Sequence, residues 1–442
     1  MSWTREEILL ATGGELIREG KGTVFSAVVT DSRKVEKGSV FVALKGERFD
    51  GHAFLKNAVR HGAKCLVVHQ RPEASLLPDV TVIKVGDTLK ALGDLAHYRR
   101  RAMAPKVMAI TGSNGKTTTK EMVAAILERA CIGGEFLRSK ILKTEGNYNN
   151  LVGLPLTLLR LRERKSVAVV ELGTSCPGEI MRLTRIAEPD IGLITSIAPA
   201  HLAGLRSVAG VAREKGDLFR GMNPRGIAVV NVDDKWIRRL GEEFKGQKIT
   251  YGKKGEVTAE CWKNRGVEGM EFTLRVGRER RRVRLRLSGE HNLSNALGAA
   301  AMAHGLGANM EAVRGGLESV EPFPMRMAIE MWKGIGLIDD TYNANPASMD
   351  AALRTLAGIK SAGKKVARFH IDHLYLLGEQ ANQVKNGALL GGMKMRQVTI
   401  GKDHKEIARR IRDYVSRGDW LLFKGSRGMN MEVALDFFKM GE

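Results

Sequence analysis

The stretch that most constrains the fold of this chain runs from Lys106 to Thr119 and reads KVMAITGSNGKTTT. An apolar run of strand length, Lys106 to Ile110, leads into a small polar segment with two glycines, and helical spacing of apolar residues begins at Lys116. Glycines let backbone N–H groups crowd around phosphate oxygens, and a helix N-terminus adds the positive end of its dipole. The stretch therefore predicts a phosphate-binding loop between a strand and a helix.

The loop itself, TGSNGKT, is a shortened form of the general pattern, because Ile110 stands where a first glycine is usual. Lys116 would reach the terminal phosphates of a nucleotide, and Thr117 would give its hydroxyl to a magnesium ion. A glycine-rich turn that binds nothing is the disfavoured alternative, because a strand and a helix flank the loop. The residues expected at the nucleotide are Gly112, Asn114, Gly115, Lys116, Thr117 and Thr118.

Length and composition indicate a globular protein of two or three domains, since 442 residues exceed one ordinary core. No apolar run is long enough to span a membrane, and the first residues do not resemble a secretory signal. The four cysteines lack metal-binding spacing, which favours reduced, mostly buried thiols. These features together predict a cytoplasmic location.

The formal net charge of +22 is the one unusual bulk property. Such a surface attracts polyanions, among them nucleic acid and phosphorylated small molecules. The densest basic run, Arg275 to Arg286, alternates arginine with apolar residues at its end, which predicts a strand with arginines facing solvent. A nucleic-acid groove is the less favoured alternative, because no aromatic residues interleave with the arginines.

Strand-like runs alternate with helical segments along the whole chain, which predicts an α/β fold in three domains. Residues 1–100 form a small N-terminal α/β domain, and residues 101–320 form a central domain with a mostly parallel sheet. Residues 321–442 form a C-terminal domain with another open α/β sheet, after a proline-containing linker at Glu321–Arg326.

Three distant segments are expected to meet at one edge of the central sheet. Glu171 ends one buried strand, His201 follows another, and the loop at Gly112 follows a third. Ligands of such sheets bind at the carboxyl ends of the strands. Magnesium prefers oxygen ligands and phosphates, and imidazole is less usual for it. Taken singly, Glu171 could instead be a helix-capping or salt-bridged acid, and His201 a loop histidine.

The chain resembles the Mur ligases, a family of ATP-dependent enzymes that build the peptide stem of peptidoglycan. The resemblance covers all three domains. In the N-terminal domain it rests on DSR at 31–33 and GSVFVAL at 38–44, and in the C-terminal domain on DDTYNANP at 339–346. The central domain supplies TGSNGKT at 111–117, GNYNN at 146–150, VELG at 170–173, PAH at 199–201, REKGDLF at 213–219 and GEHNLSN at 289–295.

The resemblance implies a UDP-binding N-terminal domain, a central ATPase domain and a Rossmann-like C-terminal domain. It is strongest to the member that adds D-alanyl-D-alanine to UDP-MurNAc-tripeptide. The implied reaction activates the tripeptide carboxylate with ATP as an acyl phosphate, which the amine of the dipeptide then attacks. A monomer in the cytoplasm, with no nucleic-acid partner and no membrane span, is the expected form.

The resemblance also implies the roles of individual residues. Lys116, His201 and Lys215 are expected to be catalytic, with Lys215 carbamylated by carbon dioxide so that a cation becomes an anionic oxygen ligand. From the sequence alone, an exposed helical lysine is the favoured interpretation of Lys215. Two magnesium sites are implied, with the ligands Thr117, Glu171, His201 and Lys215. Further ATP contacts are expected from Asn292, Asn295, Arg326, Asp340 and Tyr342, and contacts to the UDP-sugar substrate from Ser32, Arg33, Asn149 and Asn150.

One segment departs from the family pattern. Where the family has Leu-Gly-Asp-Met followed by an acidic Glu-Leu-Gly, this chain has RFHIDHLYLLGEQ at 368–380, about two residues more by comparison of the patterns. A later family histidine is missing near Lys385. We interpret His370 and His373 as residues of a surface loop rather than as two ligands of a metal ion, because no other ligand is nearby.

Two other functions remain open at this point. A related Mur or folylpolyglutamate-type ligase would add a different amino acid, although the Tyr342-Asn-Ala-Asn-Pro346 segment argues against it. A non-catalytic nucleic-acid-binding protein with a phosphate loop would explain the net charge, and would show steep salt-dependent DNA binding without ATP turnover.

Overall fold

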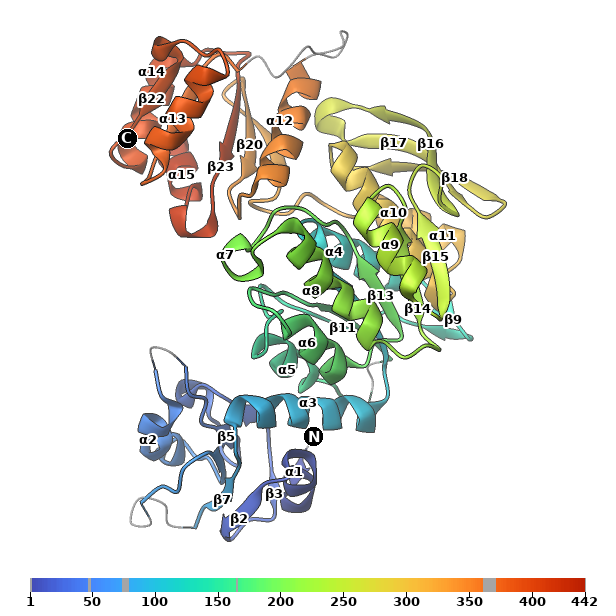
Figure 1. Ribbon diagram of the computed structural model, residues 1–442, viewed down its shortest axis with the longest axis vertical. Helices are drawn as coiled ribbons and strands as arrows, with labels where there is room; N and C mark the ends of the chain where they lie inside the picture. The colour runs from blue at the N-terminus through green and yellow to red at the C-terminus, as the bar shows by residue number, and fades with distance from the viewer. Residues whose placement is uncertain (1, 47–48, 74–78, 164–165, 361–370, 442) are drawn as a thin grey trace.

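A computed structural model describes residues 2–46, 49–73, 79–163, 166–360 and 371–441. Three α/β units follow one another along the long axis of the molecule, with the N-terminal unit at one end and the C-terminal unit at the other (Figure 1). Each unit has its own sheet and its own cluster of buried apolar side chains. The α/β fold class predicted from the alternation of apolar runs is confirmed.

The N-terminal unit is built on a five-stranded sheet in the order β2-β7-β6-β5-β4. All neighbouring strands pair in parallel except β2 and β7, which are antiparallel. Its elements are β1 (Trp3–Thr4), α1 (Arg5–Thr12), β2 (Glu15–Arg18), β3 (Val24–Phe25), β4 (Val28–Val29), β5 (Val40–Val42), α2 (Leu55–Arg60), β6 (Cys65–Val68) and β7 (Thr81–Lys84).

Helix α3 (Thr88–Met103) joins the N-terminal unit to the central one. Asp87 caps the helix by accepting hydrogen bonds from two backbone N–H groups of its first turn. Leu92 and Leu95 pack into the N-terminal core, whereas Ala96 belongs to the core of the central unit. The boundary predicted at residue 100 therefore falls inside a helix that both units share, because side chains of that helix pack into both cores.

The central unit contains a nine-stranded sheet in the order β11-β12-β8-β13-β14-β15-β16-β17-β18. Neighbours from β11 through β16 pair in parallel, and β16, β17 and β18 form an antiparallel extension. The strands are β8 (Lys106–Thr111), β11 (Ile141–Lys143), β12 (Val167–Glu171), β13 (Ile191–Ile194), β14 (Ile227–Asn231), β15 (Gln247–Tyr251), β16 (Val257–Asn264), β17 (Met270–Val276) and β18 (Glu279–Leu285).

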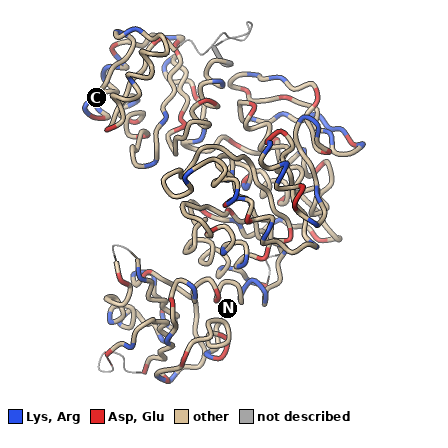
Figure 2. The backbone as a smooth tube through the Cα atoms, viewed as in Figure 1, with Lys and Arg blue, Asp and Glu red and all other residues tan. Residues whose placement is uncertain are grey.

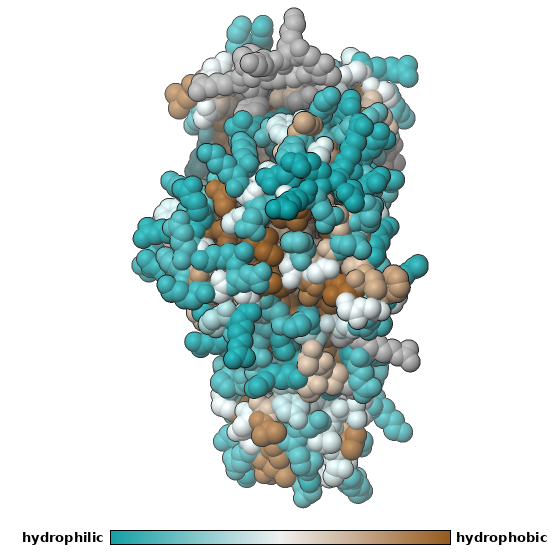
Figure 3. Space-filling model, turned by 90° about the vertical axis from the view of Figure 1, so that its right-hand side faces the viewer, coloured by the Kyte–Doolittle hydropathy of each residue, from teal (hydrophilic) through white to brown (hydrophobic). Residues whose placement is uncertain are grey.

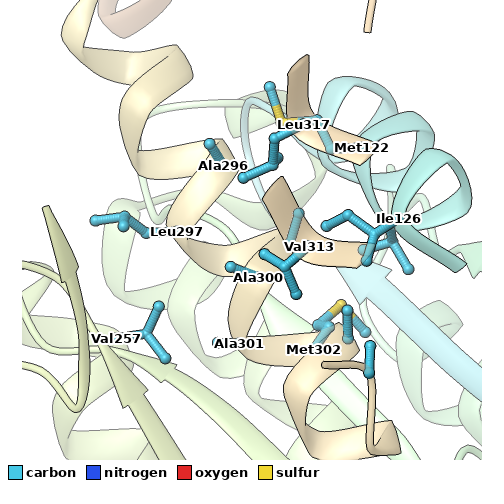
Figure 4. Close-up of a cluster of buried hydrophobic side chains, with 14 of the residues drawn as sticks. Met122, Ile126, Val257, Ala296, Leu297, Ala300, Ala301, Met302, Val313 and Leu317 are labelled. Carbon is cyan, nitrogen blue, oxygen red and sulfur yellow. The ribbon is translucent and has the colours of Figure 1, made fainter. Parts of the chain in front are cut away.

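Helices cover both faces of this sheet, as expected for a parallel sheet. On one face α4 (Lys116–Leu127), α10 (Glu290–Leu306) and α11 (Met310–Glu318) enclose an apolar cluster, in which Figure 4 shows Met122 and Ile126 of α4 facing Val313 and Leu317 of α11. The other face is covered by α5 (Gly153–Leu158), α6 (Glu179–Ala187), α8 (Val208–Gly221) and α9 (Lys235–Glu243).

The C-terminal unit has a three-stranded sheet, β19-β20-β23, and a parallel pair, β21 and β22. β20 pairs in parallel with β23 and antiparallel with β19. The elements are β19 (Ala328–Trp332), β20 (Ile335–Asp340), α12 (Pro346–Lys360), β21 (Leu374–Leu376), α13 (Ala381–Leu390), β22 (Val398–Ile400), α14 (His404–Tyr414), β23 (Trp420–Lys424) and α15 (Glu432–Met440).

The arginine-rich run forms the hairpin β17–β18, where positions of basic residues, blue in Figure 2, lie close together along the backbone. Several of its arginines are paired with acids: Arg280 contacts Glu260, Arg281 contacts Glu311 and Arg282 contacts Glu271. These ion pairs offset much of the local positive charge, which favours the predicted solvated strand over a nucleic-acid groove.

The surface in the view of Figure 3 is mostly hydrophilic, with apolar side chains in small areas. Among the described residues, no helix combines the length and the apolar character needed to cross a membrane.

The prediction of mostly buried thiols is wrong for two of the four cysteines. Cys65 is buried within β6, but Cys176 and Cys261 are exposed. Cys176 lies in the loop that follows β12, and Cys261 lies where the pairing of β16 with β17 shifts register, so the apolar neighbours of each in sequence do not enclose it. All four thiols are free, in agreement with the expected reduced state.

Helix α11 approaches α4 so closely that only glycine fits at residue 316. A Cβ atom there would lie 2.3 Å from the Cα of Ile126. We expect Gly316→Ala to lower the free energy of unfolding by about 1–3 kcal/mol, because backbone must move to relieve the overlap. Thermal and urea unfolding followed by circular dichroism would measure the change.

Gly315→Ala is the matched control on the same helix. A Cβ atom at residue 315 would meet only the side chain of Arg129, at 3.4 Å or more. Alanine there should leave stability unchanged or raise it by up to about 1 kcal/mol, through its better helix propensity. Equal destabilisation by both substitutions would contradict the close approach of α11 to α4.

Candidate active site

A cleft of about 640 Å³ lies where the C-terminal unit meets the central sheet. The register of the sheet pairs Glu171, the last residue of β12, with Ile110 of β8, and Ile194 of β13 with Thr111 of β8. The ends of three adjacent strands and the loops that follow them therefore form one wall. The cleft brings together most predicted site residues: Asn114, Gly115, Lys116, Thr117, Thr118, Asn149, Asn150, Glu171, His201, Lys215, Asn292, Asn295, Arg326, Asp340 and Tyr342.

The glycine loop is held by residues that follow β13. Ser113 N–H donates to the Ser196 carbonyl at 2.8 Å, and Asn114 N–H donates to the Ser196 hydroxyl at 3.1 Å. The Lys116 ammonium donates to the Gly112 carbonyl at 2.8 Å, so the lysine folds back over its own loop. Burial lowers the pKa of Lys116, while the nearby Glu171 opposes that shift. The loop thus presents a half-buried lysine and the N-terminus of α4 to the cleft.

The donor set at the end of β12 fits a divalent cation. Thr117 Oγ1 donates to Glu171 Oε2 at 3.2 Å, and both residues line the cleft. The other carboxylate oxygen, Oε1, is buried and has no hydrogen-bond donor among the described residues. A buried carboxylate with one oxygen that accepts no hydrogen bond, beside a hydroxyl and a phosphate-binding loop, offers the hard oxygen ligands that magnesium prefers.

Lys215 and His201 enter the same cleft from α8 and from the loop after β13. The Lys215 side chain is almost fully buried, with 1% of the residue exposed, so the alternative of an exposed helical lysine is wrong. Helix α8 turns this residue inward because Val211, Leu218 and Phe219 on the same side pack on the sheet. Among the described residues, no hydrogen bond or ion pair reaches its amine.

These surroundings favour an uncharged amine at Lys215. Burial and then the positive charge of Lys116 lower the pKa of Lys215 well below its usual range, with Glu214 acting in the opposite direction. His201 is exposed to the cleft and occupies a left-handed conformation at φ 53°. Desolvation, followed by the charges of Lys215 and Lys116, lowers the pKa of His201.

Two asparagines of α10 lie against the glycine loop. Asn295 Nδ2 donates to Asn292 Oδ1 at 3.2 Å, and Asn292 Nδ2 donates to the Ser288 carbonyl at 2.9 Å. Gly115 adopts φ 82°, and a Cβ atom there would lie 2.3 Å from Asn295 Oδ1. Gly115 is therefore required both by its backbone conformation and by the close approach of α10.

The C-terminal unit contributes charged and aromatic groups to the opposite wall. The Arg326 guanidinium stacks on Tyr342 with its carbon 3.8 Å from the ring centroid. Asp340 pairs with the Lys424 ammonium at 2.5 Å. Asn345 Nδ2 donates to Asn114 Oδ1 at 2.7 Å, which links this unit directly to the glycine loop.

Sequence reasoning missed several residues of the cleft. Lys424 ends the half-buried strand β23, and nothing in the sequence distinguished it from an ordinary surface lysine. Asn345 lies within the segment 339–346, which was already identified by its resemblance to the Mur ligases. Glu214 is buried on α8, where its carboxylate accepts from the Gly178 and Ile180 N–H groups at 2.7 and 2.8 Å and so fixes the loop after β12. Lys120 is buried beside Glu171, and nothing in the sequence distinguished it from an ordinary helical lysine.

Two of the predicted substrate residues lie away from this cleft. Ser32 is buried and Arg33 is exposed in a short 3₁₀ segment of the N-terminal unit. Arg33 forms two hydrogen bonds with the Asp31 carboxylate, at 2.9 and 2.8 Å, and this pairing lowers the pKa of Asp31 to about 2. Asp31 also caps the segment by accepting a hydrogen bond from the Arg33 N–H. A ligand common to both regions would have to extend along the molecule.

The atypical stretch is only partly described. His370 lies outside the described residues, whereas His373 stands just before β21. The His373 ring stacks on Tyr375 at 4.4 Å between centroids, and its Nε2 is 2.8 Å from Thr399 Oγ1. His373 thus lies in a loop, as interpreted, and aromatic packing half-buries its ring. Among the described residues, no cluster of three or more acidic, cysteine or histidine side chains could hold a metal.

The fold and the cleft define a multidomain α/β protein with a phosphate-binding loop at a parallel-sheet edge. Comparison with family models gives the Mur ligase middle domain over residues 110–303 and the Mur ligase catalytic domain over residues 24–100. The chain belongs to the Mur ligase family.

Known relatives extend over most of the chain. It is 40% identical to the UDP-N-acetylmuramoyl-tripeptide--D-alanyl-D-alanine ligase of Haemophilus influenzae over 74% of this chain and 70% of that protein. Identity to the ligase of the same name from Bacillus subtilis is 34%, over 93% and 92% of the two chains.

Solved structures agree in fold. The crystal structure of MurF from Acinetobacter baumannii matches with a TM-score of 0.88 and 32% identity, covering 100% of this chain and 99% of the other. The MurF ligase of Thermotoga maritima, solved in complex with ADP, matches with a TM-score of 0.79 and 25% identity over 94% and 97% of the chains.

The Asp340–Lys424 ion pair should make a large contribution to the stability of the C-terminal unit. The two side chains are 15% and 3% exposed. Lys424→Met would leave a buried carboxylate without its counterion, so we expect a loss of about 3–5 kcal/mol in unfolding free energy. Lys439→Met is the control, because the Lys439–Glu330 pair is more exposed and should change stability by at most about 1 kcal/mol.

The unfolding free energy lost in Lys424→Met should depend on pH. Burial raises the pKa of Asp340, and Lys424 opposes that shift. Without Lys424 the pKa of Asp340 rises further, so the folded state binds a proton that the unfolded state releases. Lys424→Met should therefore be less destabilising at about pH 5 than at about pH 8. Urea unfolding at both pH values measures this difference, and a loss independent of pH would contradict the burial of Asp340.

Proposed function

We propose that this protein is an ATP-dependent ligase that adds D-alanyl-D-alanine to UDP-MurNAc-tripeptide during peptidoglycan precursor synthesis. The observation that carries the proposal is the cleft in which the phosphate loop meets the Asp339–Pro346 segment, with Asn345 donating to Asn114 at 2.7 Å. The names of the relatives from H. influenzae and B. subtilis supply the substrates. Because the reaction consumes ATP, we place it in the cytoplasm, and we expect a monomer on gel filtration.

ATP would lie with its phosphates on the glycine loop and its base beside Asn292 and Asn295. Lys116 and the N-terminus of α4 would neutralise the phosphates, and Arg326, Asp340 and Tyr342 would close over the nucleotide from the C-terminal unit. Gly112, Asn114, Gly115, Thr117 and Thr118 complete this set. The UDP end of the other substrate would lie at Ser32 and Arg33, and its sugar-peptide end would pass Asn149 and Asn150 toward the cleft.

The residues at the strand ends would position the reacting groups. Magnesium ions, held by Thr117 and Glu171 and by His201 and a modified Lys215, would supply charge neutralisation when bound. The tripeptide carboxylate would attack the γ-phosphorus of ATP, releasing ADP and leaving an acyl phosphate. The dipeptide amine would then attack the acyl carbon, lose a proton and expel phosphate from a tetrahedral intermediate. The chain contributes mainly orientation and electrostatic stabilisation.

A phosphate-release assay tests this function most directly. We expect release from ATP with UDP-MurNAc-tripeptide only when D-alanyl-D-alanine is also present, and formation of the pentapeptide product by mass spectrometry. A panel of other amines separates this reaction from that of a related Mur or folylpolyglutamate-type ligase. DNA binding that falls steeply with salt, without ATP turnover, would instead favour the nucleic-acid alternative.

Lys116→Ala should abolish turnover without unfolding the protein. Its ammonium donates to the Gly112 carbonyl and would contact a phosphate, and the apolar core does not depend on it. We expect phosphate release to fall at least about 100-fold with an unchanged thermal melting temperature. Lys106→Ala is the control at the opposite end of β8, where the lysine side chain is 63% exposed, and should keep full turnover. Near-normal activity of the Lys116 variant would exclude the loop as the ATP site.

Carbamylation of Lys215 is the finer part of the proposal. A buried amine with a lowered pKa and no described partner is suited to react with carbon dioxide, and the carbamate would turn a repulsive cation into an oxygen ligand. Lys215→Ala should lose most activity, and added short-chain carboxylates should restore part of it. Lys235→Ala, which removes an exposed lysine on α9, should keep full activity and should not respond to added carboxylates. Full activity of the Lys215 variant would count decisively against the modification.

A further inference from the structure

Lys120 is a buried cation that the proposed reaction does not use. It lies on α4 one helical turn beyond Lys116 and Thr117, and its side chain is 2% exposed. Lysine is almost never buried to this degree without partners, because desolvating an ammonium is costly. The contacts of this side chain should therefore reveal what holds it there.

Among the described residues its ammonium contacts three groups, two of which lie at the end of β12 or hold it in place. Lys120 Nζ donates to the Thr144 carbonyl at 2.6 Å, and lies 2.8 Å from Glu121 Oε1 and 3.5 Å from Glu171 Oε1. Thr144 in turn accepts the Glu171 backbone N–H on its hydroxyl at 3.0 Å. Lys120 is thus tied to the segment that positions Glu171, and it approaches the carboxylate oxygen that has no hydrogen-bond donor.

Glu121 does not compensate the charge of Lys120 by itself, because it is shared with a second lysine. Lys143 of β11 pairs with the other oxygen of Glu121. The four groups form a row of alternating charge, from Lys143, which is 40% exposed, through Glu121 and Lys120 to Glu171, which is 1% exposed. Glu171 is therefore already neutralised by the protein in the absence of any metal.

We propose that Lys120 is the resident counterion of Glu171 and makes metal binding at Thr117 and Glu171 depend on a bound nucleotide. This inference rests on the proposed function, which places a divalent cation at these two residues. A cation 3.5 Å from the carboxylate repels a metal there, and the described residues offer no acidic cluster to outweigh it. Phosphate oxygens of a nucleotide on the adjacent loop supply the missing negative charge, so metal and nucleotide bind together.

Manganese binding, followed by the loss of the free-ion signal in electron paramagnetic resonance, tests this dependence without any turnover. Wild-type protein should bind the ion with ADP present and far more weakly without it. Lys120→Met should bind manganese without nucleotide at least about tenfold more tightly than wild type, because the repulsive charge is gone. Lys120→Gln, which keeps a donor for the Thr144 carbonyl, should behave in the same way if the methionine variant folds poorly.

Lys143→Met is the matched control, because it removes one positive charge from the same row without touching Glu171. It should bind manganese as wild type does. Adding Glu171→Gln to Lys120→Met should remove the extra binding, which places the ion at this carboxylate. Unchanged or weaker nucleotide-free binding in both Lys120 variants, or tighter binding in Lys143→Met as well, would overturn the proposal.

These outcomes separate the inference from the function on which it rests. Failure of wild-type protein to bind manganese even with ADP would count against the proposed nucleotide and metal site. The nucleotide-free comparison of the Lys120 and Lys143 variants would still decide whether Lys120 acts as the counterion.

Discussion

The parallel pairing of β12, β8 and β13 is the constraint on which the rest of this structure depends. Parallel strands place all their carboxyl ends at one edge of the sheet, and register then decides which residues become neighbours. Here Glu171 lies beside Ile110, and Ile194 beside Thr111. The glycine loop, an acidic strand end and the loop leading to His201 are side by side for this reason.

Burial gives these neighbours their chemical character. Lys120 and Lys215 are buried near this edge on helices packed on the sheet, and Lys116 beside them is half-buried, so three cationic side chains are poorly solvated. Such a concentration of cations favours anionic ligands and disfavours the charged form of any lysine without a partner. Lys120 is paired with Glu121 and Glu171, whereas no ion pair to Lys215 is formed among the described residues and only Glu214 nearby opposes the lowering of its pKa.

The C-terminal unit completes the cleft through few direct contacts. The bond between Asn345 and Asn114 joins the two walls, and Asp340 with Lys424 stays within the C-terminal unit. The N-terminal unit is joined differently, by the shared helix α3, whose side chains pack into two cores. The C-terminal unit meets the central one through polar bonds and through contacts of α12 with α10.

The sequence by itself determined the elements and the chemistry of the glycine loop, because apolar periodicity and glycine–lysine spacing are local properties. The short motifs likewise identified Glu171, His201, Asn295 and Arg326 as site residues, although their roles stay predictions. Tertiary structure alone decided what depends on contacts between distant segments. Lys120 and Lys424 look like ordinary lysines until Glu171 and Asp340 are packed against them, and burial depends on residues that the local pattern does not contain.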